Sequence, residues 1–193
     1  TEIGHWTVFS LGGGSIKVLE ENFEFSRKIY PYQSMHEILE EAKHLHLSLV
    51  QIVFQYEPLI HDYMSDVLSA MLSSVKRGLE ASGVMPGKLE IEKIAKSLHL
   101  QALASEDEEE TKRLKLISYA YANSEENASG HMVVTAPTLG ASGVMASLMY
   151  YLYYDCGITR HKLIEALEVA GLFGNVIKRT ATISGAVGGC AAV

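Results

Sequence analysis

The sequence predicts a mostly α-helical protein that carries a short β-hairpin at its N-terminus. Apolar residues recur at intervals of three and four positions along several stretches after residue 30, which is the spacing of one helix face. Helix-capping residues precede these stretches, and a glycine-rich turn between apolar positions occurs before them. We therefore divide the chain into a hairpin remnant at residues 1–30 and a helical domain at residues 31–193.

The hairpin is expected over residues 5–20. A triple glycine at positions 12–14 permits the positive φ angles of a tight turn. The apolar positions on its two sides are Trp6, Val8, Phe9, Ile16 and Val18. Because an isolated hairpin is barely stable in water, we expect this one to be the end of a sheet whose other strands lie outside the chain.

Two short helices are expected next. Ser34 followed by Glu37, and Ser48 followed by Gln51, both have the spacing of a capping box. In that arrangement the first side chain caps the helix and the second bonds back to the backbone of the cap. The second helix should stop before Pro58, because proline disfavours a helical conformation in the residue before it.

The third helix is the clearest, and we expect it to end at Gly83. Its buried face is predicted from apolar residues at helical spacing: Ile60, Tyr63, Met64, Val67, Leu68, Met71, Leu72, Val75 and Leu79. A weaker amphipathic stretch follows at residues 88–104.

Ser105 then precedes an acidic run at residues 106–110, which we interpret as the solvated, Ser105-capped first turn of a further helix. Ion pairs Glu108–Lys112 and Glu109–Arg113 are expected along that helix. After an uncharged loop at residues 127–143, we expect an apolar helix at 144–154, a helix at 159–179 and a terminal loop at 180–193.

Composition excludes several classes of protein. The chain has 193 residues, 48% of them hydrophobic, and a net charge of −7, which argues against nucleic-acid binding. Two cysteines are too few for a disulfide framework, so a cytoplasmic protein is predicted. Residues 127–154 carry no charge, but a proline and several glycines break the segment, which favours a core helix over a membrane span.

Two residues stand out as candidates for chemistry. Cys190 ends a glycine-rich run, where a thiol can approach a metal or cluster with little hindrance. His131 lies within the uncharged loop and is a possible functional residue. Cys156, at the end of a helix, is interpreted as a packed thiol. The other histidines, including His61 and His99, show no metal-ligand spacing and are interpreted as surface or boundary residues.

Several short runs together form a specific set of motifs. They are Glu126-Asn127-Ala128-Ser129, Val134-Thr135-Ala136-Pro137-Thr138, Gly140-Ala141-Ser142-Gly143, Ala181-Thr182-Ile183-Ser184-Gly185-Ala186 and Gly188-Gly189-Cys190, with support from Ser10-Leu11-Gly12-Gly13-Gly14 and Gly83-Val84-Met85-Pro86-Gly87. With these runs the chain resembles the iron–sulfur L-serine dehydratases. The resemblance implies a small α/β domain, of which residues 1–30 are the hairpin end, and the incomplete N-terminal part of a helical catalytic domain at residues 31–193. It also implies β-elimination of L-serine to pyruvate and ammonia at a [4Fe-4S] cluster whose exposed iron acts as a Lewis acid.

The resemblance assigns roles to particular residues. Cys190 matches the first ligand of the cluster. The residues that match the substrate pocket are Pro137, Thr138, Leu139 and Gly140, together with Ser184 and Gly185 on the loop beside the cluster. The catalytic base is not identified.

The chain also departs from the family. The second and third cluster cysteines of the family lie beyond Cys190, Cys156 does not match them, and the Ser-Ser-Ser-His-Thr segment of the small domain is missing. Since one thiolate cannot hold four irons, we predict that the isolated chain is inactive and is a fragment of the enzyme. Two alternatives stay open: a non-catalytic helical fragment or subunit that binds a partner chain or an amino acid, and a related lyase for threonine or cysteine, since Leu139 alters the pocket.

The expected partners follow from this interpretation. They are L-serine, a second subunit or missing domain, and further copies of the chain in a homo-oligomer, because an exposed hairpin edge invites pairing. No nucleic acid and no membrane is expected.

Overall fold

The computed structural model of the chain describes residues 4–12, 15–19, 29–135 and 139–180. Within these residues it contains one two-stranded antiparallel sheet and seven helices. The elements are β1 (Val8–Gly12), β2 (Ser15–Val18), α1 (Met35–Leu45), α2 (Leu49–Tyr56), α3 (Ile60–Glu80), α4 (Ala95–Ala104), α5 (Glu108–Ala128), α6 (Leu139–Tyr154) and α7 (Arg160–Thr180). The predicted fold class, mostly helical with an N-terminal hairpin, is confirmed.

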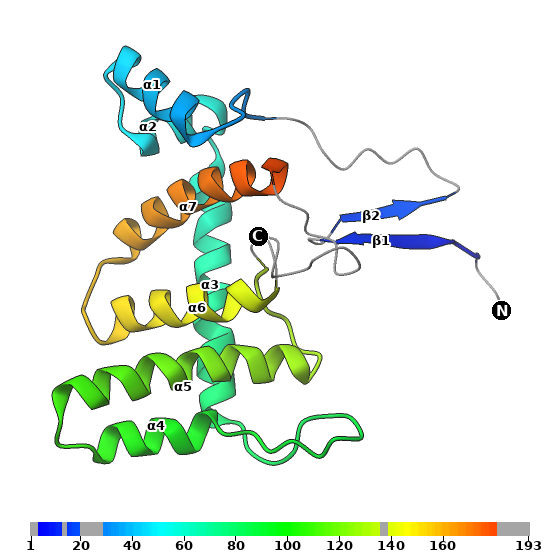
Figure 1. Ribbon diagram of the computed structural model, residues 1–193, viewed down its shortest axis with the longest axis vertical. Coiled ribbons are helices and arrows are strands. Elements are labelled where there is room, and N and C mark those ends of the chain that lie inside the picture. Colours follow the sequence, from blue (N-terminus) through cyan, green and yellow to red (C-terminus); the bar gives the residue numbers. More distant parts are fainter. Residues whose placement is uncertain (1–3, 13–14, 20–28, 136–138, 181–193) are drawn as a thin grey trace.

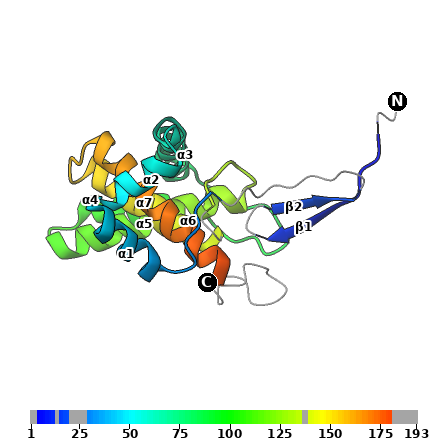
Figure 2. The same cartoon turned by 90° about the horizontal axis from the view of Figure 1, so that it is seen from above.

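Four helices form a layer. Helices α4, α5, α6 and α7 lie side by side, and α3 crosses them on one face (Figure 1). Figure 2 shows the same arrangement from above, with α3 on one side of the layer and the hairpin projecting beyond it. The main core fills the space between α3 and the layer, and includes Leu68, Met71, Val75, Tyr119, Ala122, Ala146, Met149, Leu163 and Leu167.

A second core joins α1 and α2 to α7. Its buried members are Tyr30, Tyr32, Ile38, Ala42, Ile52, Val53 and Leu172. The Arg179 guanidinium, in the last turn of α7, donates to the backbone carbonyls of Tyr30 and Tyr32. These bonds therefore join the segment that leads into α1 to the C-terminal end of α7.

The predicted caps Ser34 and Ser48 are both present, but only one of the two capping boxes is complete. Ser48 accepts from the Gln51 N–H at 3.3 Å, and the Gln51 side chain accepts from the Ser48 N–H at 2.8 Å. Ser34 accepts from the Glu37 N–H, whereas the Glu37 carboxylate accepts from the N–H of Gln33 at 2.7 Å. The predicted return bond to Ser34 is thus wrong by one residue, because Gln33 presents its N–H to the same carboxylate.

Several predicted boundaries are wrong. Helix α3 ends at Glu80, before Gly83, and residues 88–94 of the predicted stretch at 88–104 belong to the loop between α3 and α4, which begins at Ala95. Within that loop Val84 pairs with Glu92 in an isolated β-bridge. Helix α6 begins at Leu139 rather than at 144, so part of the predicted loop is helical.

The start of α5 also differs from the prediction. Its cap is Asp107, which accepts from the Glu110 N–H at 3.0 Å, while Ser105 accepts from the Asp107 N–H. The acidic residues 108–110 form the exposed first turn, as predicted. Arg113 pairs with Glu110 at 2.8 Å instead of Glu109, because the three-residue spacing also brings a carboxylate within reach.

Helix α4 is capped by a residue that is distant in sequence. No side chain of its own N-cap position bonds to the first turn. Instead the buried Glu125 of α5 accepts from the N–H groups of Ile94 and Ala95, at 2.6 and 3.1 Å. A carboxylate at this position also suits the positive end of the helix dipole. Glu125 therefore joins α4 to α5.

Replacing Glu125 by alanine is expected to lower the free energy of unfolding by about 1–2 kcal/mol, since two N–H groups lose their acceptor. Glu125→Gln keeps a carbonyl oxygen for them and should cost less than alanine. Urea unfolding followed by circular dichroism measures both. Equal stability of the alanine variant and the wild type would contradict the cap.

None of the helices in the described ranges has both the length and the apolar character that a bilayer crossing requires. The uncharged segment that raised this question ends in α6, which packs in the main core.

Candidate active site

The predicted site region begins at the end of α5, where three charged or ionisable side chains meet. The Glu126 carboxylate, only 2% exposed, accepts from Arg77 Nε of α3 at 2.7 Å and lies 3.0 Å from His131 Nδ1. Arg77 also donates through Nη2 to the backbone carbonyl of Met132 at 3.0 Å. Two helices and the segment after α5 are thus held by one buried carboxylate.

The backbone places His131 beside this carboxylate. Gly130 has a φ of +78°, a conformation that favours glycine and reverses the chain after α5. The N–H of His131 then donates to the backbone carbonyl of Glu126 at 3.0 Å. The imidazole is consequently fixed at both backbone and side chain, while more than half of it stays exposed.

Electrostatics keep Glu126 ionised. Burial opposes its ionisation, yet the hydrogen bonds and charges of Arg77 and His131 hold the pKa of this carboxyl below its ordinary value. The carboxylate therefore accepts from both partners without being protonated near neutral pH.

A buried polar bridge positions the start of α6. Ser74 Oγ of α3 donates to Asn123 Oδ1 of α5 at 2.7 Å, and Asn123 Nδ2 donates to Ser142 Oγ of α6 at 3.4 Å. All three residues are buried. Because buried polar groups are costly unless paired, these bonds favour a single arrangement of α3, α5 and α6.

The structure locates only some of the predicted site residues. Leu139 and Gly140 are the first two residues of α6, and Gly140 is exposed. The predicted residues that lie outside the described part of the chain are Pro137, Thr138, Ser184, Gly185 and Cys190. His131 lies on the segment that precedes α6, on the side of α5 that carries Glu126.

The described residues do not form a ligand set for a cluster. Cys156, interpreted from the sequence as a packed thiol, is exposed near the end of α6, beside Tyr151. Across the described ranges no three His, Cys, Asp or Glu side chains gather closely enough to hold a metal ion. These residues alone therefore do not fit a [4Fe-4S] cluster.

Sequence reasoning also missed a further buried carboxylate, on α7. Glu168 of α7 is buried, and its Oε1 lies 2.9 Å from His61 Nδ1 of α3. The rings of His61 and His161 are 5.3 Å apart. The sequence predicts a surface or boundary position for His61, because no local pattern points to a partner. Glu168 is 107 positions away in the chain.

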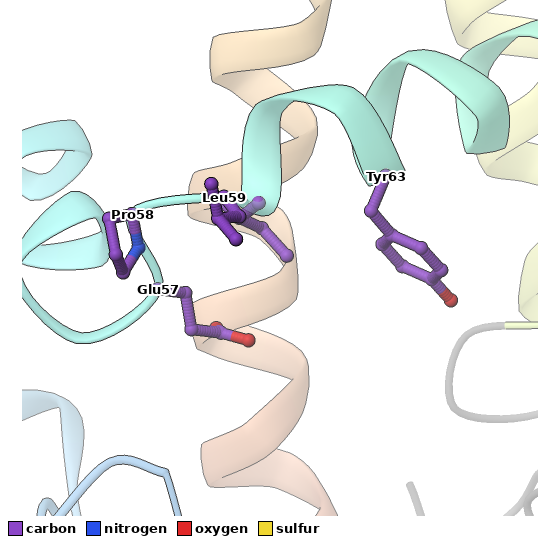
Figure 3. A pocket seen from close by; sticks show the side chains of 5 residues that line it. Glu57, Pro58, Leu59 and Tyr63 are labelled. Atoms are coloured by element: carbon purple, nitrogen blue, oxygen red, sulfur yellow. The ribbon is translucent and has the colours of Figure 1, made fainter.

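A pocket of about 480 Å³ opens elsewhere, at the corner between α2 and α3. Figure 3 shows Glu57, Pro58, Leu59 and Tyr63 around it, with α7 behind. The Tyr30 hydroxyl donates to the Glu57 carboxylate, and burial together with Glu57 raises the pKa of that tyrosine. No predicted site residue lines this pocket, so it does not extend the site at α6.

Comparison with known proteins identifies the family. The family model of the serine dehydratase alpha chain matches residues 20–193. L-serine dehydratase 2 of Escherichia coli (strain K12) is 34% identical over 95% of this chain and 44% of its own length. The L-serine dehydratases of Haemophilus influenzae and Streptomyces coelicolor are each 32% identical, over 98% and 95% of this chain and 45% and 43% of their own lengths.

The chain spans less than half the length of these curated relatives. The match extends through the end of α5, the start of α6 and the terminal segment that contains Cys190. This chain belongs to the serine dehydratase alpha chain family.

Proposed function

We propose that the full-length protein containing this chain is a lyase that deaminates L-serine to pyruvate and ammonia by β-elimination. The observation that carries this proposal is the family match over residues 20–193, joined by relatives that are named L-serine dehydratase. Residues 1–30 would be the end of a small α/β domain, and residues 31–193 the N-terminal part of the catalytic domain.

The proposed substrate-binding residues are Pro137, Thr138, Leu139, Gly140, Ser184 and Gly185, with His131 as a possible addition. The position of Leu139 and Gly140 in the first turn of α6 supports this. The first N–H groups of a helix have no partner within the helix, and they suit an anion such as the carboxylate of an amino acid.

His131 contributes through its placement. Its backbone and imidazole are both bonded to Glu126, which fixes the chain five residues after the carboxylate. Arg77 holds the next carbonyl, that of Met132. The chain is therefore held at His131 and Met132, a few positions before the proposed binding residues, and this supports a role for His131 in positioning.

The proposed cofactor is a [4Fe-4S] cluster with Cys190 as one ligand. When bound, such a cluster supplies a Lewis-acidic iron that favours departure of a hydroxide group. Since the described residues offer no ligand set, the remaining ligands are assigned to the part of the full-length protein outside this chain.

The proposed setting is a cytoplasmic homo-oligomer. Two cysteines in 193 residues, too few for a disulfide framework, support a reducing compartment. The short, two-stranded sheet with exposed Val8 and Phe9 supports pairing with further strands or subunits.

The proposal is tested with the full-length protein purified without oxygen. We expect it to deaminate L-serine to pyruvate faster than it deaminates L-threonine to 2-oxobutanoate or L-cysteine to pyruvate and hydrogen sulfide. Cys190→Ser should abolish turnover and the visible absorbance of the cluster, whereas Cys156→Ser, the matched control at the exposed thiol, should retain both. Turnover in the Cys190→Ser variant would reject the ligand assignment, and absence of pyruvate from the wild type would reject the lyase.

A further inference from the structure

Helix α6 has no charged residue on any side, but the other described elements cover only part of its surface. Its sixteen residues, Leu139–Tyr154, contain no Asp, Glu, Lys or Arg. A helix of this composition is typical of a core position with neighbours all around it. In the structure α3 covers one side, and α5 and α7 lie along its flanks (Figure 1).

The uncovered side faces directly away from α3. Ala146 and Met149 are buried in the core beneath α3, whereas Val144 and Leu148 are 67% and 42% exposed. Gly140 is exposed one turn before Val144. The four-residue spacing from Gly140 to Val144 to Leu148 makes one stripe, about half a turn from the buried side.

Helix α7 adds a second apolar stripe next to the first. Ile164 and Leu167 are buried toward α3, and the opposite side of the helix carries Ala166, Val169 and Phe173. Ala166 is exposed, and the other two are half-buried. Figure 2 shows α3 on one side of α6 and α7, so these stripes lie on the opposite side.

We propose that this outer face, defined by Gly140, Val144, Leu148, Ala166, Val169 and Phe173, is the docking surface for a further helical layer of the same polypeptide. The layer would come from the part of the full-length protein that lies outside this chain. Helices α4–α7 would then be a middle layer, with α3 on one face and the new helices on the other.

Two observations favour this occupant over a second copy of the chain. More than half of the length of each relative lies outside the region matched here, which is ample for several helices. The face also belongs to the helix that begins with the proposed substrate-binding residues, and it carries no charged group among its defining residues. A contiguous exposed apolar patch of this kind marks an interaction surface. The inference rests on the proposed full-length protein, but not on which reaction that protein performs.

Photo-crosslinking in the full-length protein identifies the occupant. A benzoylphenylalanine is placed at Leu148 in one variant and at Phe173 in another, so that a folding defect in one does not remove the test. We expect irradiation to join each position to residues of the same polypeptide beyond residue 193. Crosslinks that double the mass of the chain would assign the face to a second copy, and a face that stays open to solvent would give no crosslink; either result overturns the proposal.

A charge substitution gives a second measurement on the full-length protein. Val144→Asp would bury a carboxylate under the new layer, so its melting temperature should fall by more than about 5 °C. The matched control is Leu100→Asp inside α4, where the leucine is 58% exposed and little change is expected. A Val144→Asp variant that melts with the wild type would show that the face stays in water.

Discussion

Gly78→Ala is expected to lower the free energy of unfolding by about 3 kcal/mol. The reason is the crossing of α3 and α5. A Cβ at Gly78 would lie 2.3 Å from the carbonyl oxygen of Ala122 and 2.7 Å from its Cα. These are backbone atoms within a helix, so they cannot rotate away, and the two helices would have to separate.

The separation would spread through the core. Ala122, at the crossing, and Val75, one turn before Gly78 in α3, are both fully buried. The hydrogen bond between Ser74 of α3 and Asn123 of α5 joins the same two helices. Moving α5 away from α3 therefore also weakens a buried polar contact. Thermal and urea unfolding of the variant measure the loss.

Gly174→Ala is the matched control. Gly174 lies inside α7, and a Cβ there would meet no atom within 4 Å. Because alanine has the higher helix propensity, this variant should be as stable as the wild type or more stable by up to about 1 kcal/mol. Equal effects of the two substitutions would show that helix propensity, not close approach, governs Gly78.

The difference between Gly78 and Gly174 also shows what the sequence could predict. Apolar spacing located α3 nearly to its last residue, because that helix buries one continuous stripe. Spacing could not show that Gly78 is a crossing point, since this depends on α5, more than forty positions later. Likewise the sequence predicts a loop at Leu139, because the glycines and serines near it are poor helix formers in isolation. In the structure this stretch is the start of α6, because packing of α6 against α3 and α5 overrides that preference.

The candidate site was predictable in part for the same reason. The motif at residues 126–129 and His131 were visible locally, whereas Arg77 was not, because it is 49 positions from Glu126 and looks like any polar residue at the end of a helix. Long-range pairing also explains why Glu125 was missed as the cap of α4. Local patterns report a residue's neighbours in sequence, and these side chains act through neighbours in space.

The Arg77–Glu126 pair leads to a second large effect. Arg77→Met is expected to destabilise the fold by about 2 kcal/mol at neutral pH, because the buried Glu126 carboxylate then keeps only His131 as a side-chain donor. This figure is below the usual cost of breaking a buried pair, since the Arg77 side chain is 43% exposed and water screens its charge. Arg77→Lys should recover part of the loss, because it restores the charge without both donors.

The effect should depend on pH in a defined direction. Arg77 and His131 lower the pKa of Glu126 in the folded protein, so the unfolded chain takes up its proton first as the pH falls. The contribution of the pair is therefore present above the ordinary pKa of about 4.5 and is lost as the pH falls through the lower folded value. Urea unfolding at about pH 7 and about pH 3 should show that Arg77→Met costs less free energy of unfolding at the acid pH.

Glu126→Gln is the matched control, because an amide does not titrate. Arg77→Met added to that variant should cost the same free energy of unfolding at both pH values. The opposite result is a cost of Arg77→Met that does not change with pH in the protein that keeps Glu126. It would mean that the packing of the arginine side chain, rather than its charge interaction with Glu126, holds the end of α5 to α3.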